Sequence, residues 1–228
     1  MIVGIVGLGR MGGAMAERLR GQGFEVVGWD HNRAANDKAA AGGLRIAENA
    51  RAVAAASEIV VSSITEDNGA RRVFTSPDGV LDGDVAGKLF IEMSTLQPMT
   101  GRALAPFVET KGARFIEAPV LGTIPQVRAG TLFAMVGGAH EDLVRARIVL
   151  EKLTRRVLHM GPHGCGYAMK LAANIGLGAY VQAIAESLAL GAQQGLASTR
   201  CSTRCRRARP RPGGSKPRPA CSRASRAT

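Results

Sequence analysis

Three glycines near the start of the chain have the spacing that binds a diphosphate. They follow an apolar strand pattern at Ile2–Val6 and open a helical one. The first glycine permits a tight turn, the second lets the backbone approach a pyrophosphate, and the third allows close helix–strand packing. The phosphates then face the free N–H groups at the helix N-terminus. The pattern therefore predicts a dinucleotide site that comprises Gly7, Leu8, Gly9, Arg10, Met11 and Gly12.

An acidic residue at the end of the next strand pattern supports this site. Asp30 closes the run Glu25–Trp29, 23 residues after Gly7, where a carboxylate can accept both ribose hydroxyls. The same carboxylate repels a 2′-phosphate, which favours NAD. Arg33 stands close by and could hold that phosphate, so NADP remains an alternative.

A second chemical pattern combines a lysine with an amide. Lys170 and Asn174 are four residues apart in a helical stretch and therefore project from one face. Oxidation of a hydroxyl-bearing carbon needs a base for the hydroxyl proton, and a lysine in an apolar site beside a positive nicotinamide can have a pKa low enough to serve. The competing interpretation is a lysine that snorkels to solvent and a surface amide. Spacing alone leaves both open.

Strand and helix patterns alternate along most of the chain. We predict strands at Ile2–Val6, Glu25–Trp29, Ile59–Ser62, Leu89–Glu92, Arg114–Glu117, Leu132–Val136 and Val157–Met160, and helices near Met11–Gln22, Arg33–Ala41, Ala50–Ala55, Asn68–Phe74, Met99–Thr110 and Glu141–Leu153. This alternation predicts an α/β fold, a Rossmann-type doubly wound and mostly parallel sheet over residues 1–163. Gly161–Gly164 marks its boundary.

Residues 164–197 form a different element, one long helix that is apolar on most faces. We interpret it as the start of an incomplete all-α domain, because a helix of this kind must be buried in protein. Its polar interruptions, Lys170, Asn174, Gln182 and Glu186, argue against a membrane span.

The last 31 residues have another composition. Residues 198–228 contain ten of the 30 Lys and Arg, three of the four cysteines, and no Asp or Glu. Ser198–Cys205 is a perfect four-residue repeat, and if it is written with GC-rich codons, another reading frame gives the helical pattern Leu-Asp-Ala-Met. We interpret the segment as a disordered, out-of-frame tail. The alternative is a basic arm that binds nucleic acid, which the lack of aromatic residues does not favour.

Without the tail, the charge and cysteine content become ordinary. Residues 1–197 have a net charge of +2, so the overall +12 is a property of the tail. Cys165 is the one cysteine of this part, which fits a reducing cytoplasm, and no secretory signal is evident at the start. The histidines are scattered, and we predict no metal site.

Four motifs in this order resemble those of the β-hydroxyacid dehydrogenases, the group that includes 3-hydroxyisobutyrate dehydrogenase and tartronate semialdehyde reductase. Gly7–Ala16 is similar to the family's cofactor signature, Glu92–Pro98 to its Ser-Thr turn, Glu117–Thr123 to its substrate loop and Gly164–Asn174 to its catalytic helix. The resemblance covers residues 1–197.

The resemblance implies a role for each matching residue. Lys170 acts as the proton-transferring group and Asn174 orients the substrate. Ile64, Thr65 and Thr95 line the cofactor, while Ser94, Leu121, Gly122 and Thr123 contact the substrate, the last three through backbone N–H groups. Leu121 stands where the family has serine, and Thr123 where it has glycine, so the resemblance does not fix the size or polarity of the substrate.

The sequence thus predicts an NAD(P)-dependent oxidoreductase that transfers hydride between the cofactor and a small β-hydroxy acid or its semialdehyde. The family is usually homo-oligomeric through its helical domain, and we expect that interface to be incomplete. An open pocket admits water and leaves Lys170 solvated, so we expect impaired turnover. The alternative is a catalytically weak or inactive dinucleotide-binding fragment.

Overall fold

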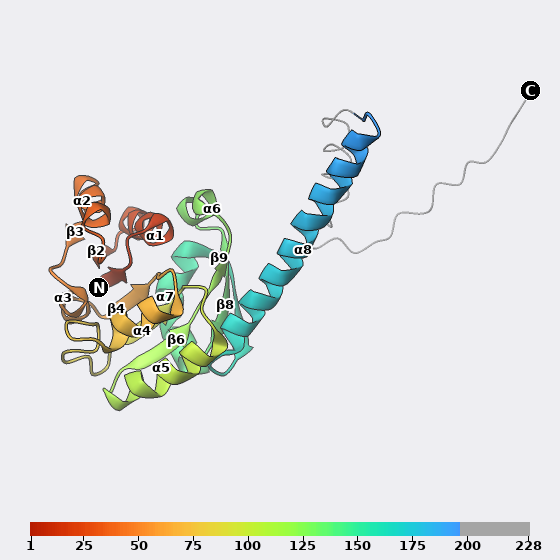
Figure 1. Ribbon diagram of the computed structural model, residues 1–228. Coiled ribbons are helices and arrows are strands. Elements are labelled where there is room, and N and C mark those ends of the chain that lie inside the picture. The colour runs from red at the N-terminus through yellow and green to blue at the C-terminus, as the bar shows by residue number, and fades with distance from the viewer. Residues whose placement is uncertain (197–228) are drawn as a thin grey trace, which may run out of the picture. The chain divides into compact units, whose positions relative to one another are not determined.

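The computed structural model describes residues 1–196, and the predicted tail lies outside the described residues. One mixed sheet organises them (Figure 1), in the strand order β3-β2-β1-β4-β5-β6-β8-β7 with β9 beside β8. The strands are β1 Ile2–Val6, β2 Glu25–Trp29, β3 Arg45–Ile46, β4 Ile59–Ser62, β5 Leu89–Glu92, β6 Arg114–Glu117, β7 Val120–Leu121, β8 Leu132–Gly137 and β9 Thr154–Gly161. The predicted Rossmann-type, mostly parallel sheet is confirmed, and the antiparallel exceptions are the pairs of β8 with β6 and β7.

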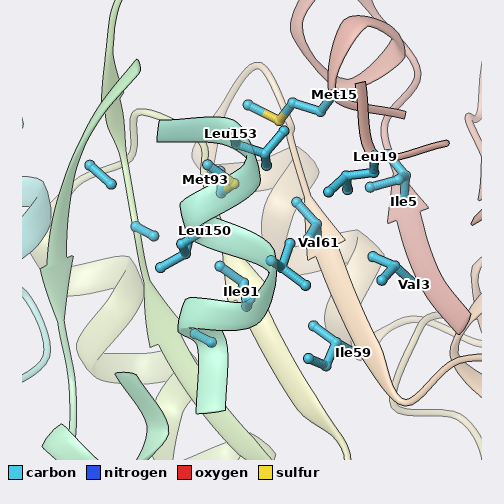
Figure 2. Packing of buried hydrophobic residues seen from close by; sticks show 14 of the residues in the cluster. Val3, Ile5, Met15, Leu19, Ile59, Val61, Ile91, Met93, Leu150 and Leu153 are labelled. Carbon is cyan, nitrogen blue, oxygen red and sulfur yellow. The ribbon is translucent and has the colours of Figure 1, made fainter. Parts of the chain in front are cut away.

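Helices cover both faces of this sheet. They are α1 Arg10–Gly21, α2 Arg33–Ala41, α3 Ala50–Ala56, α4 Asp67–Thr75, α5 Pro98–Thr110, α6 Ile124–Ala129, α7 His140–Leu153 and α8 Cys165–Gln193. Alternate strand residues face opposite sides. Val3, Ile5 and Val61 pack with Met15 and Leu19 of α1 and with Leu150 and Leu153 of α7 on one side (Figure 2). Val60, Phe90 and Phe115 pack with residues of α3, α4 and α5 on the other.

Three short elements were not predicted. The strands β3 and β7 have two residues each, too few for an alternating pattern to be recognised. The helix α6 has six residues and begins with a capping box in which Thr123 and Gln126 satisfy each other's free groups. The sequence Thr-x-x-Gln was a visible signal for that helix.

The parallel register aligns the strand ends that precede the candidate site. Val6 pairs with Ser62, Ser62 with Glu92, and Glu92 with Glu117. The loops after β1, β4, β5 and β6 therefore leave the sheet at one carboxyl edge. In doubly wound sheets, ligands bind outside this edge.

The long helix α8 spans 29 residues, Cys165–Gln193. Contacts divide the chain inside it, into a unit Met1–Ile175 and a unit Gly176–Thr228. In the described part of the second unit, Leu177, Val181 and Leu190 are more than half exposed. By length and composition, with a mean hydropathy of 1.3, α8 is the one helix of residues 1–196 that could cross a membrane.

Candidate active site

The three glycines of the first loop are each required for a different reason. Gly7 has a φ of +92°, and a Cβ there would lie 2.2 Å from the carbonyl oxygen of Ser63. A Cβ on Gly12 would lie 1.8 Å from the carbonyl oxygen of Gly7. A Cβ on Gly9 would meet nothing within 4 Å. Two glycines thus allow the chain to close up behind the loop, and Gly9 leaves open the face that a pyrophosphate needs.

The helix that follows presents an electropositive end. Gly9 is the N-cap of α1, and neither a capping side chain nor an acidic residue of the first turn satisfies its free N–H groups. These groups and the helix dipole favour an anion at this position. Arg10 is exposed at the first helical position, and Met11 packs against the core that surrounds α1. The loop therefore fits the diphosphate of a dinucleotide.

Asp30 is joined to this loop through its carboxylate. Its side chain is buried, and its Oδ2 atom accepts a hydrogen bond from the N–H of Leu8 at 2.7 Å. Its Oδ1 atom accepts from the N–H of Asn32 at 2.8 Å. The side-chain amide of Asn36 holds the backbone of Asp30 from both sides, at 2.8 Å each. The acid is thus fixed at the end of β2, where a ribose would bind.

Arg33, the residue that could bind the 2′-phosphate of NADP, is directed toward solvent. Its side chain is 94% exposed, and its Nε atom lies 3.9 Å from an oxygen of Asp37. No described contact ties its guanidinium to the cofactor loop. Of the two residues on which the choice between NAD and NADP was argued, Asp30 is held by hydrogen bonds and Arg33 is exposed.

The loops after β4 and β5 are bound to each other. The N–H of Ile64 donates to the Oγ atom of Ser94 at 2.6 Å. Ser94 is buried, whereas Thr65 and Thr95 are exposed at the edge of the sheet. The predicted substrate contact of Ser94 stays a prediction, because its hydroxyl is engaged within the protein here.

Glu92 lies beneath these two loops and was not recognised as part of the site from the sequence. It is fully buried and accepts hydrogen bonds from the N–H of Ser94 at 2.7 Å and from the hydroxyl of Ser62. Burial raises its pKa to about 7, and the hydrogen bonds from Ser62 and Ser94 oppose that rise. The sequence signal that could have identified Glu92 as part of the site is a single acidic residue at the end of an apolar strand.

The raised pKa of Glu92 predicts that stability depends on pH. A carboxyl whose pKa is higher in the folded state stabilises the fold fully below pH 4.5 and loses that contribution as pH rises to about 7. We expect this loss to be about 3 kcal/mol. The difference in urea unfolding between the unsubstituted chain and Glu92→Gln, from pH 4.5 to 8, measures it, because burial raises the pKa of Glu117 to about 7 as well. In Glu92→Gln the Ser62 hydroxyl can rotate to accept from the new amide, so the variant should fold and show a flatter profile; an unchanged profile contradicts the assignment.

The predicted substrate loop forms the end of β7 and the start of α6. Leu121 is half-buried and pairs with Phe133 of β8, and Gly122 and Thr123 are exposed. The N–H of Thr123 donates to the Oε1 atom of Gln126 at 2.8 Å as part of the capping box. In this arrangement one of the three N–H groups predicted to bind a carboxylate, that of Thr123, is already bonded. The substrate role of the three residues stays a prediction.

The predicted catalytic pair lies on the second and third turns of α8. Lys170 and Asn174 are both half-buried. Burial lowers the pKa of Lys170 below its ordinary value. One turn earlier, the fully buried Tyr167 packs with Leu96 and Ile64. The start of α8 is therefore in contact with the loops that follow β4 and β5.

The hydroxyl of Tyr167 is buried without a hydrogen-bond partner among the described residues. A buried polar group of this kind costs about 1–3 kcal/mol. We expect Tyr167→Phe to raise the free energy of unfolding by about 1 kcal/mol, because the ring packing stays and the unpaired hydroxyl goes. Tyr167→Ala, the control, should lower it by about 3–5 kcal/mol. Thermal unfolding measures both, and a lower melting temperature for the phenylalanine variant contradicts the prediction.

Hydrogen bonds join two pairs of the residues that the sequence predicts. Leu8 is bonded to Asp30, and Ile64 is bonded to Ser94. The loop Leu121–Thr123 is engaged with β8 and α6 instead. Among residues 1–196, no three His, Cys, Asp or Glu side chains gather as metal ligands.

Comparison with known proteins identifies the fold family. Residues 2–161 match the family model described as the NAD binding domain of 6-phosphogluconate dehydrogenase. The chain is 37% identical over 195 residues to a 3-hydroxyisobutyrate dehydrogenase of Pseudomonas aeruginosa, which covers 85% of this chain and 65% of that protein. It is 34% identical over 194 residues to a 2-(hydroxymethyl)glutarate dehydrogenase of Eubacterium barkeri, with 85% and 64% covered.

Solved structures agree with these relatives. The structure of 3-hydroxyisobutyrate dehydrogenase from Mycobacterium tuberculosis with L-serine superposes with a TM-score of 0.79 at 34% identity, and the match covers 86% of this chain and 66% of that one. The chain thus spans about two thirds of the length of such relatives. It belongs to the family of the NAD-binding domain of 6-phosphogluconate dehydrogenase and, within it, to the β-hydroxyacid dehydrogenases.

Proposed function

We propose that this chain is an oxidoreductase that transfers hydride between NAD and a small β-hydroxy acid or its semialdehyde. The observation that carries the proposal is Lys170, half-buried with a lowered pKa on a helix whose preceding turn packs against the Ile64 loop. A lysine that can lose its proton, one turn from a contact with the Ile64 loop that is predicted to line the cofactor, has the chemistry of a general base.

Different residues of the chain would bind the cofactor, transfer the proton and orient the substrate. The Gly7–Gly12 loop and Asp30 would hold the cofactor, and Ile64, Thr65 and Thr95 would line it. When bound, NAD supplies the hydride acceptor. Lys170 takes the proton of the substrate hydroxyl at Nζ, and returns it in the reverse direction, while Asn174 orients that hydroxyl by a hydrogen bond.

The fixed carboxylate of Asp30 supports a preference for NAD over NADP. Asp30→Asn removes the charge and keeps one oxygen for the N–H of Leu8 or Asn32. We expect affinity for NADPH to rise and that for NADH to fall, each by about tenfold, because the repulsion of a 2′-phosphate and the acceptor for the ribose are both weakened. Titration calorimetry with both cofactors measures the ratio. An unchanged ratio contradicts this placement of the ribose.

The substrate is proposed from the class that the relatives' names give. The Pseudomonas aeruginosa relatives are a 3-hydroxyisobutyrate dehydrogenase and an NAD-dependent L-serine dehydrogenase, 37% and 32% identical to this chain. Both names denote small hydroxy acids. Leu121, at the position where the family has serine, would make the pocket more apolar than usual.

A second candidate function is a dinucleotide-binding protein with weak or no catalysis. It is favoured by the exposed apolar side chains on α8. Protein that covers α8 would exclude water from Lys170, and turnover depends on that exclusion. We also propose a cytoplasmic location, a small-molecule partner, and neither membrane nor nucleic acid as a partner of residues 1–196.

One preparation of the 228-residue chain tests both candidates. NADH binding is followed through the emission of Trp29, the single tryptophan, which is adjacent to Asp30. Turnover is then measured with 3-hydroxyisobutyrate, L-serine, tartronate semialdehyde and succinic semialdehyde. NADH binding with turnover far below that of the Pseudomonas aeruginosa relative is the expected result. Binding with no turnover selects the second candidate, and the absence of binding overturns both.

A further inference from the structure

A second buried carboxylate ends the strand beside that of Glu92. Glu117 closes β6, pairs in register with Glu92 and is fully buried. It has a different set of partners. Its carboxylate accepts the N–H of Gly164 and, at 3.1 Å, the N–H of Tyr167. Both donors belong to the start of α8.

Glycines around Glu117 make room for this arrangement. A Cβ on Gly137 would lie 2.4 Å from the Oε1 atom of Glu117. A Cβ on Gly166 would lie 2.6 Å from the carbonyl oxygen of Met135. The first turn of α8 therefore lies directly on β8, with the carboxylate enclosed between them.

The first turn of α8 has no carboxylate of its own to accept hydrogen bonds from its free N–H groups. Free N–H groups at a helix N-terminus need an acceptor, and a carboxylate there also interacts favourably with the helix dipole. The turn before α8 is held from a second side, since the Nε atom of Arg102 on α5 donates to the carbonyl oxygen of His163 at 3.3 Å.

We propose that Glu117 is a positioning residue that fixes the first turn of α8, and through it Lys170, against the carboxyl edge of the sheet. Lys170 follows Tyr167 by one helical turn. The hydrogen bond from the N–H of Tyr167 to Glu117 therefore also sets the position of Lys170 relative to the sheet. The consequence for catalysis rests on the proposed function of Lys170.

Substitution by glutamine should have different effects at Glu117 and Glu92, because their hydrogen-bond partners differ. Glu92 has a hydroxyl partner, Ser62, which can turn and accept from a glutamine amide. Both partners of Glu117 are backbone N–H groups, which can only donate. In Glu117→Gln one of these donors faces the NH₂ of the new side chain. Glu92→Gln is thus a matched control of equal burial on the adjacent strand.

Hydrogen exchange in the full-length protein tests the proposal. Relative to the unsubstituted chain, Glu117→Gln should exchange the amides of residues 164–170 about tenfold faster, the size of a lost helix cap. Glu92→Gln should leave those amides unchanged. Glu117→Asp, which keeps the charge but withdraws it by one methylene, should act in the same direction as the glutamine variant and serves if that variant does not fold. Unchanged exchange in both Glu117 variants, or an equal increase in Glu92→Gln, overturns the proposal.

A second measurement separates positioning from charge. The pH dependence of Lys170 acetylation by acetic anhydride, read by peptide mass, reports the titration of its amine. Burial lowers the pKa of Lys170, and a lysine that loses its packed position becomes more hydrated, so its midpoint in Glu117→Gln should rise above that of the unsubstituted chain. Loss of the negative charge alone would lower the midpoint, and that result overturns the proposal. Neither readout requires turnover, so an inactive chain would refute the proposed function and leave this test intact.

Discussion

Gly9→Ala is expected to abolish tight NADH binding while the protein remains as stable as before. The added methyl group meets nothing in the protein within 4 Å, so no packing is disturbed. It lies instead on the face of the loop that the pyrophosphate must approach. We expect NADH affinity to fall about a hundredfold, or about 2.7 kcal/mol, with an unchanged melting temperature. Trp29 emission and thermal unfolding measure the two quantities.

Gly12→Ala should act on the stability of the protein instead. Its methyl group would lie 1.8 Å from the carbonyl oxygen of Gly7, and a backbone atom cannot move aside as a flexible side chain can. We expect a loss of more than about 4 kcal/mol in the free energy of unfolding, the range typical of severe core disruption. NADH binding is then lost as a consequence of unfolding.

Gly21→Ala is the control for both variants. It lies at the end of the same helix, and a Cβ there also meets nothing within 4 Å. Alanine is the better helix former by up to about 1 kcal/mol, so slight stabilisation and normal NADH binding are expected. If Gly9→Ala binds NADH as well as Gly21→Ala does, the pyrophosphate does not lie on this loop.

The sheet was predictable because its strands are buried, β-branched runs separated by helical patterns. The seven predicted strands and six predicted helices of residues 1–163 are present with boundaries close to those expected. The missed elements, β3, β7 and α6, are too short for a periodic signal to develop, and β7 depends on pairing with a strand that comes later in the chain.

The site was predictable only where its chemistry is local. The glycine loop can be recognised in the sequence because two close backbone contacts, at Gly7 and Gly12, and the open face at Gly9 fall within six residues. The roles of Glu92 and Glu117 could not be predicted in this way, since each binds groups 30 to 50 residues away. Their hydrogen-bond partners are mostly backbone N–H groups, which every residue but proline carries and which leave no trace in the sequence.

Thr123 illustrates a conflict between two local interpretations. The resemblance to a substrate loop assigns its N–H to a carboxylate, whereas the Thr-x-x-Gln pattern assigns the same N–H to Gln126. The second arrangement is the one that the structure contains. A capping box joins the side chains and backbone N–H groups of two residues three positions apart and is therefore complete before any ligand binds.

Lys170→Met should reduce turnover by about 10²- to 10⁴-fold, the usual contribution of a general acid or base. Methionine fills much of the space of the lysine stem and leaves the half-buried site without a proton acceptor. The affinity for NADH should be unchanged, because the cofactor loop lies on other elements. Steady-state rates in both directions, with Trp29 emission for binding, measure these effects, and Lys111→Met on the exposed end of α5 is the control.

The pH dependence of the same reaction tests whether Lys170 acts as the base in oxidation and as the acid in reduction. Burial lowers the pKa of Lys170, so the neutral amine that oxidation requires forms at lower pH than for an exposed lysine. Oxidation of the hydroxy acid should therefore accelerate as pH rises toward the pKa of Lys170 and level off above it. Reduction needs the protonated amine and should slow over the same range. If Lys170→Met retains both the rate and this pH profile, another group carries the proton and the proposed mechanism is wrong.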